Sequence, residues 1–177
     1  MTDLVTRAKN YATIAHAYAV RKFGPPEPYI EHVKRVAALV AATGARPEVV
    51  AAAYLHDVVE DTEVTAADVT REFGPEVAEL VVALTNVPTV PGGPNRAARH
   101  KMDIARLAKA SGDAHTIKCA DLIDNTSTIN AHAPADFAAL YLKEKAELLK
   151  VLTRGDPGLR AAALKNVSST FLENSST

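Results

Sequence analysis

The chain has 177 residues and a formal net charge of -1, so it carries no general electrostatic attraction for nucleic acid or membrane surfaces. An anionic ligand therefore needs a local cluster of basic side chains. The single cysteine, Cys119, excludes an intramolecular disulfide and indicates a reducing compartment. The N-terminal residues lack the apolar block of a signal peptide, and no apolar run is long enough to span a bilayer. We expect a cytoplasmic protein that has neither nucleic acid nor membrane as a partner.

Hydrophobic residues make up 47% of the chain but aromatic residues only 5%, and an alanine-rich chain of this kind favours closely packed helices. Apolar residues recur at helical spacing in segments that Gly and Pro separate. The pattern predicts helices over residues 3–23, 29–43, 46–57, 65–73, 75–84, 96–110, 115–131 and 135–152, then a last helix of about ten residues after Pro157. Residues 86–95 read as a flexible loop, and the tail at 173–177 is polar. No repeat or linker divides the chain, so we expect a single all-α domain over residues 1–177, a bundle of about eight to ten helices.

A dense polar cluster follows the apolar segment 49–55. His56 and Asp57 are adjacent, and Glu60 and Asp61 follow one helical turn later. A divalent ion needs several converging imidazole and carboxylate groups, so further ligands must come from other helices. Two candidates are His32, on the second predicted helix, and Asp121, inside the apolar segment 117–124.

Each of these residues also has a simpler explanation. Lys118, Asp121, Asn125 and Thr128 fall on one face of their helix, and such a face can be the solvent side. His32 alone is typical of a partly buried surface histidine. The order His, His-Asp, Asp on three successive apolar segments favours a metal site instead.

The same order resembles the HD superfamily of metal-dependent phosphohydrolases, in particular the RelA/SpoT hydrolase domain and the small alarmone hydrolases, which include metazoan SpoT homologues. The resemblance covers residues 10 to 150. The segments that carry it are Ala15-His16, Arg21-Lys22, Gly24, 27–32, 54–62, 73–78, Leu84-Thr85, 118–121 and Asn125. The segment Leu55-His56-Asp57-Val58-Val59-Glu60-Asp61-Thr62 is the most specific of them.

The resemblance implies an HD-type helical fold and the removal of the 3′-pyrophosphate from (p)ppGpp-like alarmones by a metal-activated water. It implies one Mn²⁺ ion per chain, a nucleotide 3′-diphosphate as substrate, and leaves room for a homo-oligomer. It assigns the residues to three groups: metal ligands (His32, His56, Asp57, Asp121), catalytic acids beside the water (Glu60, Asp61) and substrate-binding residues (Arg21, Lys22, Lys101 or the neighbouring Arg99, Lys118, Asn125, Thr128, Tyr141).

The chain departs from the family pattern at several positions. Two extra residues lie in the Pro25-Pro26 run, Val33 replaces a proline, Leu122 replaces a basic residue, and the loop 86–95 has an unusual form. These changes leave the choice between guanine and adenine open. Two alternatives also stay open: another HD enzyme, either a 5′-nucleotidase or a deoxynucleotide phosphohydrolase, and a non-catalytic module that senses a nucleotide.

Overall fold

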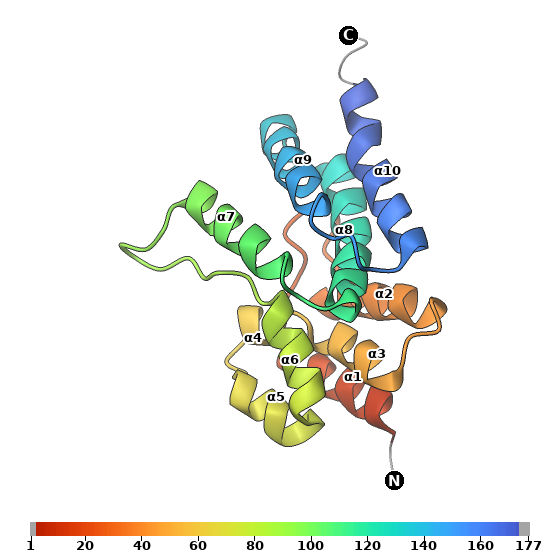
Figure 1. Cartoon of the computed structure of the whole chain (residues 1–177). Coiled ribbons are helices and arrows are strands. Elements are labelled where there is room, and N and C mark those ends of the chain that lie inside the picture. Colours follow the sequence, from red (N-terminus) through yellow and green to blue (C-terminus); the bar gives the residue numbers. More distant parts are fainter. Residues whose placement is uncertain (1–2, 174–177) are drawn as a thin grey trace.

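The structure, a computed structural model, describes the backbone of residues 3–173 and the side chains of residues 3–168. Within this range the chain forms ten helices and no strand, which confirms the all-α prediction (Figure 1). They are α1 (Leu4–Ala15), α2 (Tyr29–Ala42), α3 (Pro47–Leu55), α4 (Val58–Asp61), α5 (Ala66–Phe73), α6 (Pro75–Leu84), α7 (Arg96–Leu107), α8 (Gly112–His132), α9 (Ala135–Leu149) and α10 (Pro157–Glu173). No helix in the described part of the chain is long and apolar enough to cross a membrane.

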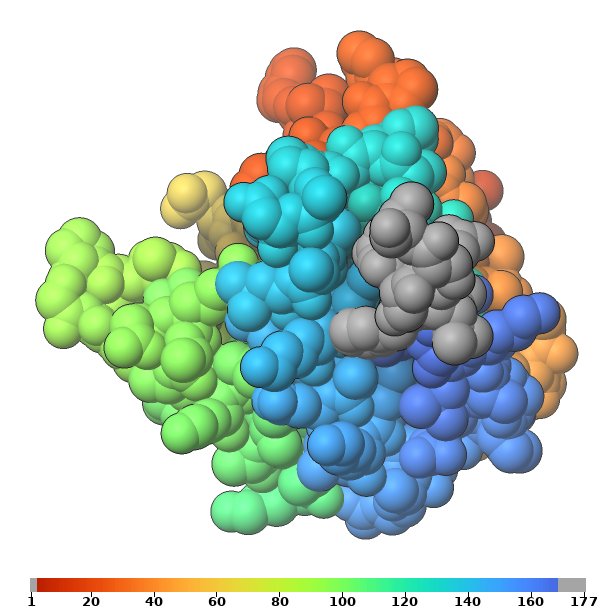
Figure 2. Space-filling view, turned by 90° about the horizontal axis from the view of Figure 1, so that it is seen from above, coloured from red at the N-terminus to blue at the C-terminus, as the bar shows by residue number. Residues whose placement is uncertain are grey.

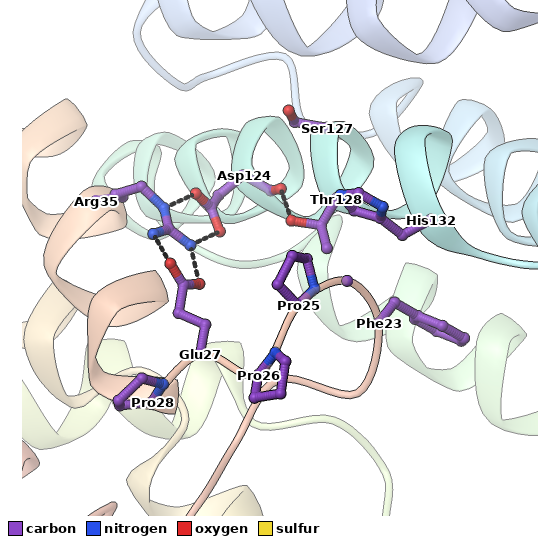
Figure 3. Close-up of a pocket in the computed structure, with 11 residues that line it drawn as sticks. Phe23, Pro25, Pro26, Glu27, Pro28, Arg35, Asp124, Ser127, Thr128 and His132 are labelled. Carbon is purple, nitrogen blue, oxygen red and sulfur yellow. Dashed lines mark hydrogen bonds and ion pairs between the residues drawn. The ribbon is translucent and has the colours of Figure 1, made fainter.

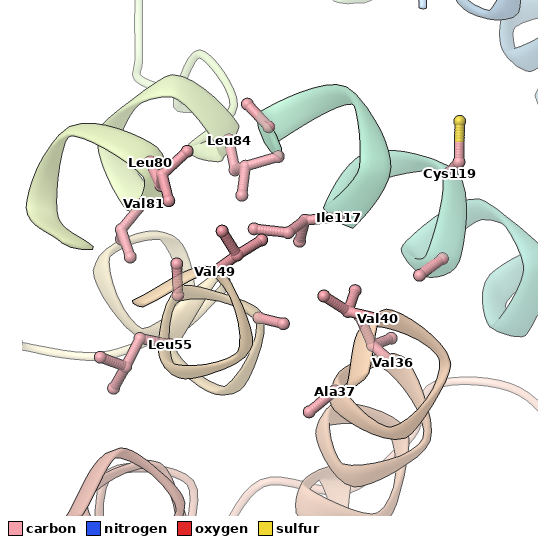
Figure 4. Close-up of a cluster of buried hydrophobic side chains, with 14 of the residues drawn as sticks. Val36, Ala37, Val40, Val49, Leu55, Leu80, Val81, Leu84, Ile117 and Cys119 are labelled. Atoms are coloured by element: carbon pink, nitrogen blue, oxygen red, sulfur yellow. The ribbon is translucent and has the colours of Figure 1, made fainter. Parts of the chain in front are cut away.

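Helix α3 lies at the centre of the molecule because it is apolar on all sides. Residues 49–53 and Leu55 are all buried, and the helix packs against α1, α2, α6 and α8. Figure 4 shows side chains from these elements meeting around Val49, with Val40 from α2, Leu84 from α6 and Ile117 from α8. The central helix ends directly at His56 and Asp57, so the packing of the core fixes where these two residues lie.

The second half of the chain is built around α8. This helix packs against α2, α3 and α6 on one side and against α9 and α10 on the other. Helix α7 contacts α6 and α9, and the loop before it projects from the body of the molecule (Figure 1 and Figure 2). The buried middle of α8 therefore faces the same region of the core as the end of α3.

The predicted first helix, residues 3–23, is wrong in its second half. Helix α1 ends at Ala15, and the following chain turns back on itself, with an isolated bridge between Val20 and Pro28. The backbone N–H of Arg21 donates to the oxygen of Glu27 and that of Tyr29 to the oxygen of Ala19, and this turn leaves Tyr18 fully exposed. The turn is possible because Gly24 has a φ of 88°, which other residues rarely adopt.

Other boundaries differ less. Helix α8 begins at Gly112 rather than at His115, because the Ser111 side chain accepts a hydrogen bond from the backbone N–H of Ala114. Helix α10 is 17 residues long, where the sequence predicted about ten. The predicted capping box at Thr65 and Asp68 is present. Of the predicted polar tail at 173–177, residues 174–177 lie outside the described residues.

Truncation of Ile117 tests the importance of the contact between the two halves of the core. Its side chain is fully buried among α2, α3, α6 and α8, so Ile117→Ala should lower the free energy of unfolding by about 2–5 kcal/mol. Denaturant unfolding measures this loss. Val82→Ala on α6 is the control, because Val82 is 48% exposed and should change stability by less than about 0.5 kcal/mol. Equal effects of the two variants would contradict the described packing.

Candidate metal centre and substrate pocket

Two imidazole rings are held with the same nitrogen pointing into the candidate site. The Nδ1–H of His32 donates to Oδ2 of Asp124 at 2.7 Å, and that of His56 donates to the backbone oxygen of Ala53 at 2.8 Å. These bonds leave the lone pair of each ring on Nε2. Both Nε2 atoms are buried, and neither has a hydrogen-bond partner of good geometry among the described residues. Each therefore presents an unused donor of the kind that a metal ion binds.

Two carboxylates complete the set of donors. Oδ2 of Asp57 lies 3.0 Å from Nε2 of His56 and 3.6 Å from Nε2 of His32. Oδ1 of Asp121 lies 3.5 Å from Nε2 of His32 and 3.7 Å from Nε2 of His56. Metal–ligand bonds of about 2.1 Å place neighbouring donors roughly 3.0–3.4 Å apart. The donor atoms of His32, His56 and Asp57 thus form one group in which all lie within 4.8 Å of one another, and Asp121 lies beside both imidazoles of that group.

The charge of this cluster also calls for a cation. Burial disfavours a charged imidazole, but the carboxylates of Asp121, Asp124 and Asp57 outweigh burial and raise the pKa of His32 to about 9. Burial would likewise raise the pKa of Asp57, yet the neighbouring imidazoles hold it well below its usual value. A divalent ion would supply the positive charge that protons supply otherwise. The residues present therefore fit a divalent metal ion.

Asp121 is oriented by the residues one turn away on α8. Its Oδ2 accepts a hydrogen bond from Nζ of Lys118 at 2.8 Å, and its Oδ1 accepts one from Nδ2 of Asn125 at 2.5 Å. Nη1 of Arg21 then donates to Oδ1 of Asn125 at 2.9 Å. The carboxylate of Asp57 is oriented by Tyr29, whose Oη donates to its Oδ2 at 2.6 Å. Lys118 and Asn125, which the sequence predicted to bind substrate, are thus in contact with a candidate metal ligand.

The two acids predicted to act on water lie on the short helix α4. Glu60 is held at its position by Asn86, whose backbone N–H and side-chain Nδ2 donate to the carboxylate at 3.0 and 3.1 Å. Asp61 as a whole is exposed, but desolvation of its carboxyl together with the charges of Asp57 and Glu60 raises its pKa to about 6. An acid with a pKa in this range can exchange a proton near neutral pH.

A small cavity of about 190 Å³ lies beside this cluster. Its walls come from the segment before α2 and from α8 and α9: Arg21, Lys22, Phe23, Tyr29, Asn125, Thr128, Ile129 and Tyr141. The cations there are in contact with aromatic rings. Arg21 lies 5.9 Å from the centre of the Tyr29 ring, and Nζ of Lys22 lies 5.3 Å from that of Phe23. The structure thus gathers five of the predicted substrate-binding residues around one cavity, namely Arg21, Lys22, Asn125, Thr128 and Tyr141.

Lys101 and Arg99 do not line this cavity. Lys101 is exposed on α7 and makes no hydrogen bond or ion pair with another described residue, while Arg99 donates to the backbone oxygen of Pro94 at 2.9 Å. Both belong to the part of the molecule that projects from the body. Their role in substrate binding stays a prediction.

Sequence analysis missed three charged residues near the site. Asp124 binds His32 and also Arg35, whose Nε lies 2.5 Å from Oδ1 of that carboxylate. Nζ of Lys145 lies 4.9 Å from the centre of the Tyr141 ring and has no carboxylate partner within hydrogen-bonding distance among the described residues. The spacing gave a signal for two of them, since Asp124 is three residues from Asp121 and Lys145 is four from Tyr141.

A second cavity, of about 500 Å³, lies on the other side of Asp124 (Figure 3). The extra residues Pro25 and Pro26 form one wall of it, and the Glu27–Arg35–Asp124 contacts line another. The insertion relative to the family pattern therefore shapes this outer cavity. Val33 and Leu122, the two other departures, are both fully buried in the core.

Comparisons with known proteins agree with this geometry. A family model described as HD domain matches residues 8–152. The guanosine-3′,5′-bis(diphosphate) 3′-pyrophosphohydrolase MESH1 of Danio rerio is 29% identical over 174 residues, which cover 97% of this chain and 94% of the relative. The MESH1 protein of Drosophila melanogaster is 34% identical over 126 residues, which cover 70% of this chain and 68% of the relative. A solved structure described as a metazoan ortholog of SpoT that hydrolyzes ppGpp has a TM-score of 0.84, 26% identity and 97% coverage of both chains. The chain therefore belongs to the HD domain family, in the branch that contains the MESH1 proteins.

Proposed function

We propose that this chain is a metal-dependent hydrolase that removes the 3′-pyrophosphate from guanosine 3′,5′-bis(diphosphate) and related alarmones. The observation that carries the proposal is the convergence of four metal donors beside a cavity lined by cations. The Nε2 atoms of His32 and His56 lie 3.0–3.7 Å from the carboxylate oxygens of Asp57 and Asp121. The MESH1 relatives, which carry this activity in their names, align with this chain over most of its length.

The donor set indicates how the ion would be held, and we propose Mn²⁺ as that ion. His32, His56, Asp57 and Asp121 would bind it, and Lys118 and Asn125 would keep the Asp121 carboxylate in place. When bound, a divalent ion polarises phosphoryl oxygens and lowers the pKa of water in its shell.

The acids of α4 are suited to the proton transfers of this reaction. Water attacks the phosphorus nearest the ribose, the bond from that phosphorus to the 3′ oxygen breaks, and pyrophosphate leaves while the ribose oxygen takes up a proton. We assign the acceptance of the proton from water to Asp61, because its pKa of about 6 suits a general base near neutrality. Glu60, which Asn86 holds, would orient the same water.

The phosphates of the substrate would be bound by the cations of the smaller cavity. Arg21 and Lys22 line it, and Lys145 lies over the Tyr141 ring that forms part of its wall. Lys22 and Lys145 make no ion pair with a described carboxylate, so their charges are available to an anion. Arginine in contact with a ring can also stack on a nucleobase, which fits Arg21 for the base end of the substrate.

Metal binding can be tested without the substrate. Calorimetric titration of chelator-treated protein with Mn²⁺ should show one ion per chain, and His56→Ala or Asp121→Asn should weaken binding by at least about 100-fold. His132→Ala is the matched control, because His132 is exposed and lies outside the donor set. Binding that survives in His56→Ala, or that is lost in His132→Ala, would contradict the assigned ligands.

The reaction itself is tested by incubation with guanosine 3′,5′-bis(diphosphate) and Mn²⁺, with separation of pyrophosphate from orthophosphate. We expect pyrophosphate in the absence of chelator, and a kcat about 100-fold lower for Glu60→Gln or Asp61→Asn. Glu63→Gln should retain activity, because Glu63 is exposed beyond the end of α4. Release of orthophosphate alone would favour a nucleotidase. Binding of the alarmone without formation of any product would favour a sensing module. The adenosine analogue, run in parallel, reports the nucleobase preference.

Lys145 should give substrate binding a dependence on pH. Burial, together with the charge of Lys118, lowers the pKa of Lys145 to about 8, so its ammonium group loses its proton as the pH rises through that value. KM should therefore rise from about pH 7 to about pH 9, and Lys145→Met should raise it about tenfold at the lower pH. Lys145→Arg should keep a low KM across this range because arginine stays charged.

Lys143→Met is the control for that series, since Lys143 is exposed on the same helix. A KM that is unchanged in Lys145→Met would remove this lysine from the substrate site.

A further inference from the structure

Behind His32, on the side away from the other metal donors, lies a chain of charged groups formed by Asp124, Arg35 and Glu27. Asp124 on α8 accepts from Nδ1 of His32 at 2.7 Å and from Nε of Arg35 at 2.5 Å. Nη2 of Arg35 also lies 3.3 Å from Oδ2 of Asp124. Nη1 and Nη2 of the guanidinium donate to the two carboxylate oxygens of Glu27, each at 2.8 Å. Figure 3 shows Arg35 lying between the two carboxylates.

We propose that Arg35 and Glu27 are positioning residues for the metal centre, which act by fixing the Asp124 carboxylate against His32 and by keeping it from drawing Arg21 out of the substrate cavity. The inference rests on the proposed metal site. It assigns a role to residues that touch neither the ion nor the substrate.

The first part follows from the geometry of the His32 ring. Nε2 can serve as a metal donor only while Nδ1 carries the proton, and Asp124 is the acceptor that holds it there. An aspartate side chain can rotate, and its carboxylate is here only 9% exposed. The planar fork of Arg35 binds Asp124 through two nitrogens and so fixes its orientation, in a way that a single-point contact could not. Glu27 in turn fixes the guanidinium.

The second part follows from the position of Arg21. Its Nη2 lies 3.7 Å from Oδ2 of Asp124, while its Nη1 donates to Asn125 at 2.9 Å. Asp124 therefore has two cations within reach, one on each side. Since Arg35 supplies the positive charge that the buried carboxylate requires, Arg21 stays with Asn125 and faces the cavity. Without Arg35, Asp124 would pair more closely with Arg21, and the substrate would lose that contact.

The alternative is that Arg35 has a purely structural role, which a control variant can distinguish from a role at the metal site. Arg35 joins α2 to α8 and to the segment before α2, so it could simply hold these parts together. Its side chain is 43% exposed at the edge of the outer cavity, which makes its replacement compatible with folding. Arg46 also binds two carboxylates, Glu76 at 2.6 Å and Asp113 at 2.9 Å, but on the surface and away from the metal site. It thus offers a matched control that removes the same kind of contact away from the metal site.

The experiment compares Arg35→Met, Arg35→Lys, Glu27→Gln and Arg46→Met. For each variant, Mn²⁺ affinity is measured by calorimetry and the melting temperature by circular dichroism. The tautomer of His32 is measured by ¹⁵N NMR of the metal-free protein at a pH above the raised pKa of about 9, where the imidazole is neutral. We expect Arg35→Met to weaken Mn²⁺ binding about 10–100-fold and to reduce the population of the Nδ1–H tautomer. Arg35→Lys should restore part of the affinity, and Glu27→Gln should show a smaller loss than Arg35→Met. Arg46→Met should bind Mn²⁺ as the unaltered protein does.

Two results would overturn the proposal: unchanged affinity and tautomer in Arg35→Met, or equal losses of affinity in Arg35→Met and Arg46→Met. The kinetic arm tests Arg21, since Arg35→Met at saturating Mn²⁺ should raise KM for the alarmone about tenfold with a smaller change in kcat. Failure of the alarmone reaction in the unaltered protein would contradict the proposed function only, because metal affinity and the tautomer are measured without substrate.

Discussion

The structure depends on the burial of two imidazoles and two carboxylates at one point inside a helical core. Three helices have to meet there, since His32 comes from α2, Asp121 from α8, and His56 with Asp57 from the end of α3. An apolar core alone would not tolerate these carboxylates, because an ionised group in such surroundings needs a partner charge. The polar contacts around the cluster follow from this requirement. Lys118 and Tyr29 each bind one of the carboxylates, and Asp124 binds one of the imidazoles.

Much of the fold could be predicted because its signals are local, whereas the four candidate ligands stay a prediction that rests on their order along the chain. His56 and Asp57 end a helix that is apolar all round, and Asp121 interrupts an apolar segment, so each stands out in its own part of the sequence. The prediction that the first helix continues over residues 16–23 failed because of contacts with the chain that follows this segment. Helical spacing continues there in the sequence, but the backbone of Arg21 and Tyr29 bonds instead to Glu27 and Ala19, which no local pattern encodes. The pairing of Arg35 with Asp124 was missed for a similar reason, since 89 residues separate the two partners.

Cations that bind carboxylates and cations that lie over aromatic rings cannot be told apart by composition, and Arg96 does both, since it binds Glu144 and lies 5.4 Å from the centre of the Phe137 ring. Arg35, Arg46 and Arg96 each bind carboxylates at 2.9 Å or less, and they join helices or loops to one another. Lys22 and Lys145 lie instead over aromatic rings near the smaller cavity, without a described carboxylate partner. A ring stabilises a cation while leaving it free to meet an anion, whereas a carboxylate competes with that anion. The net charge near zero thus conceals a local excess of available positive charge, which is what a substrate with two diphosphates requires.

The segment 21–28 connects the two ends of the site. It carries Arg21, which faces the substrate cavity, and Glu27, which holds Arg35 on the outer side. The two extra residues at Pro25 and Pro26 lie between them, so the length of this segment sets the spacing of both contacts. A change there reaches His32 through Glu27, Arg35 and Asp124, as well as the base end of the pocket through Arg21. The insertion that separates this chain from the family pattern therefore lies between two residues that reach the metal centre by different routes, Arg21 through Asn125 and Glu27 through Arg35.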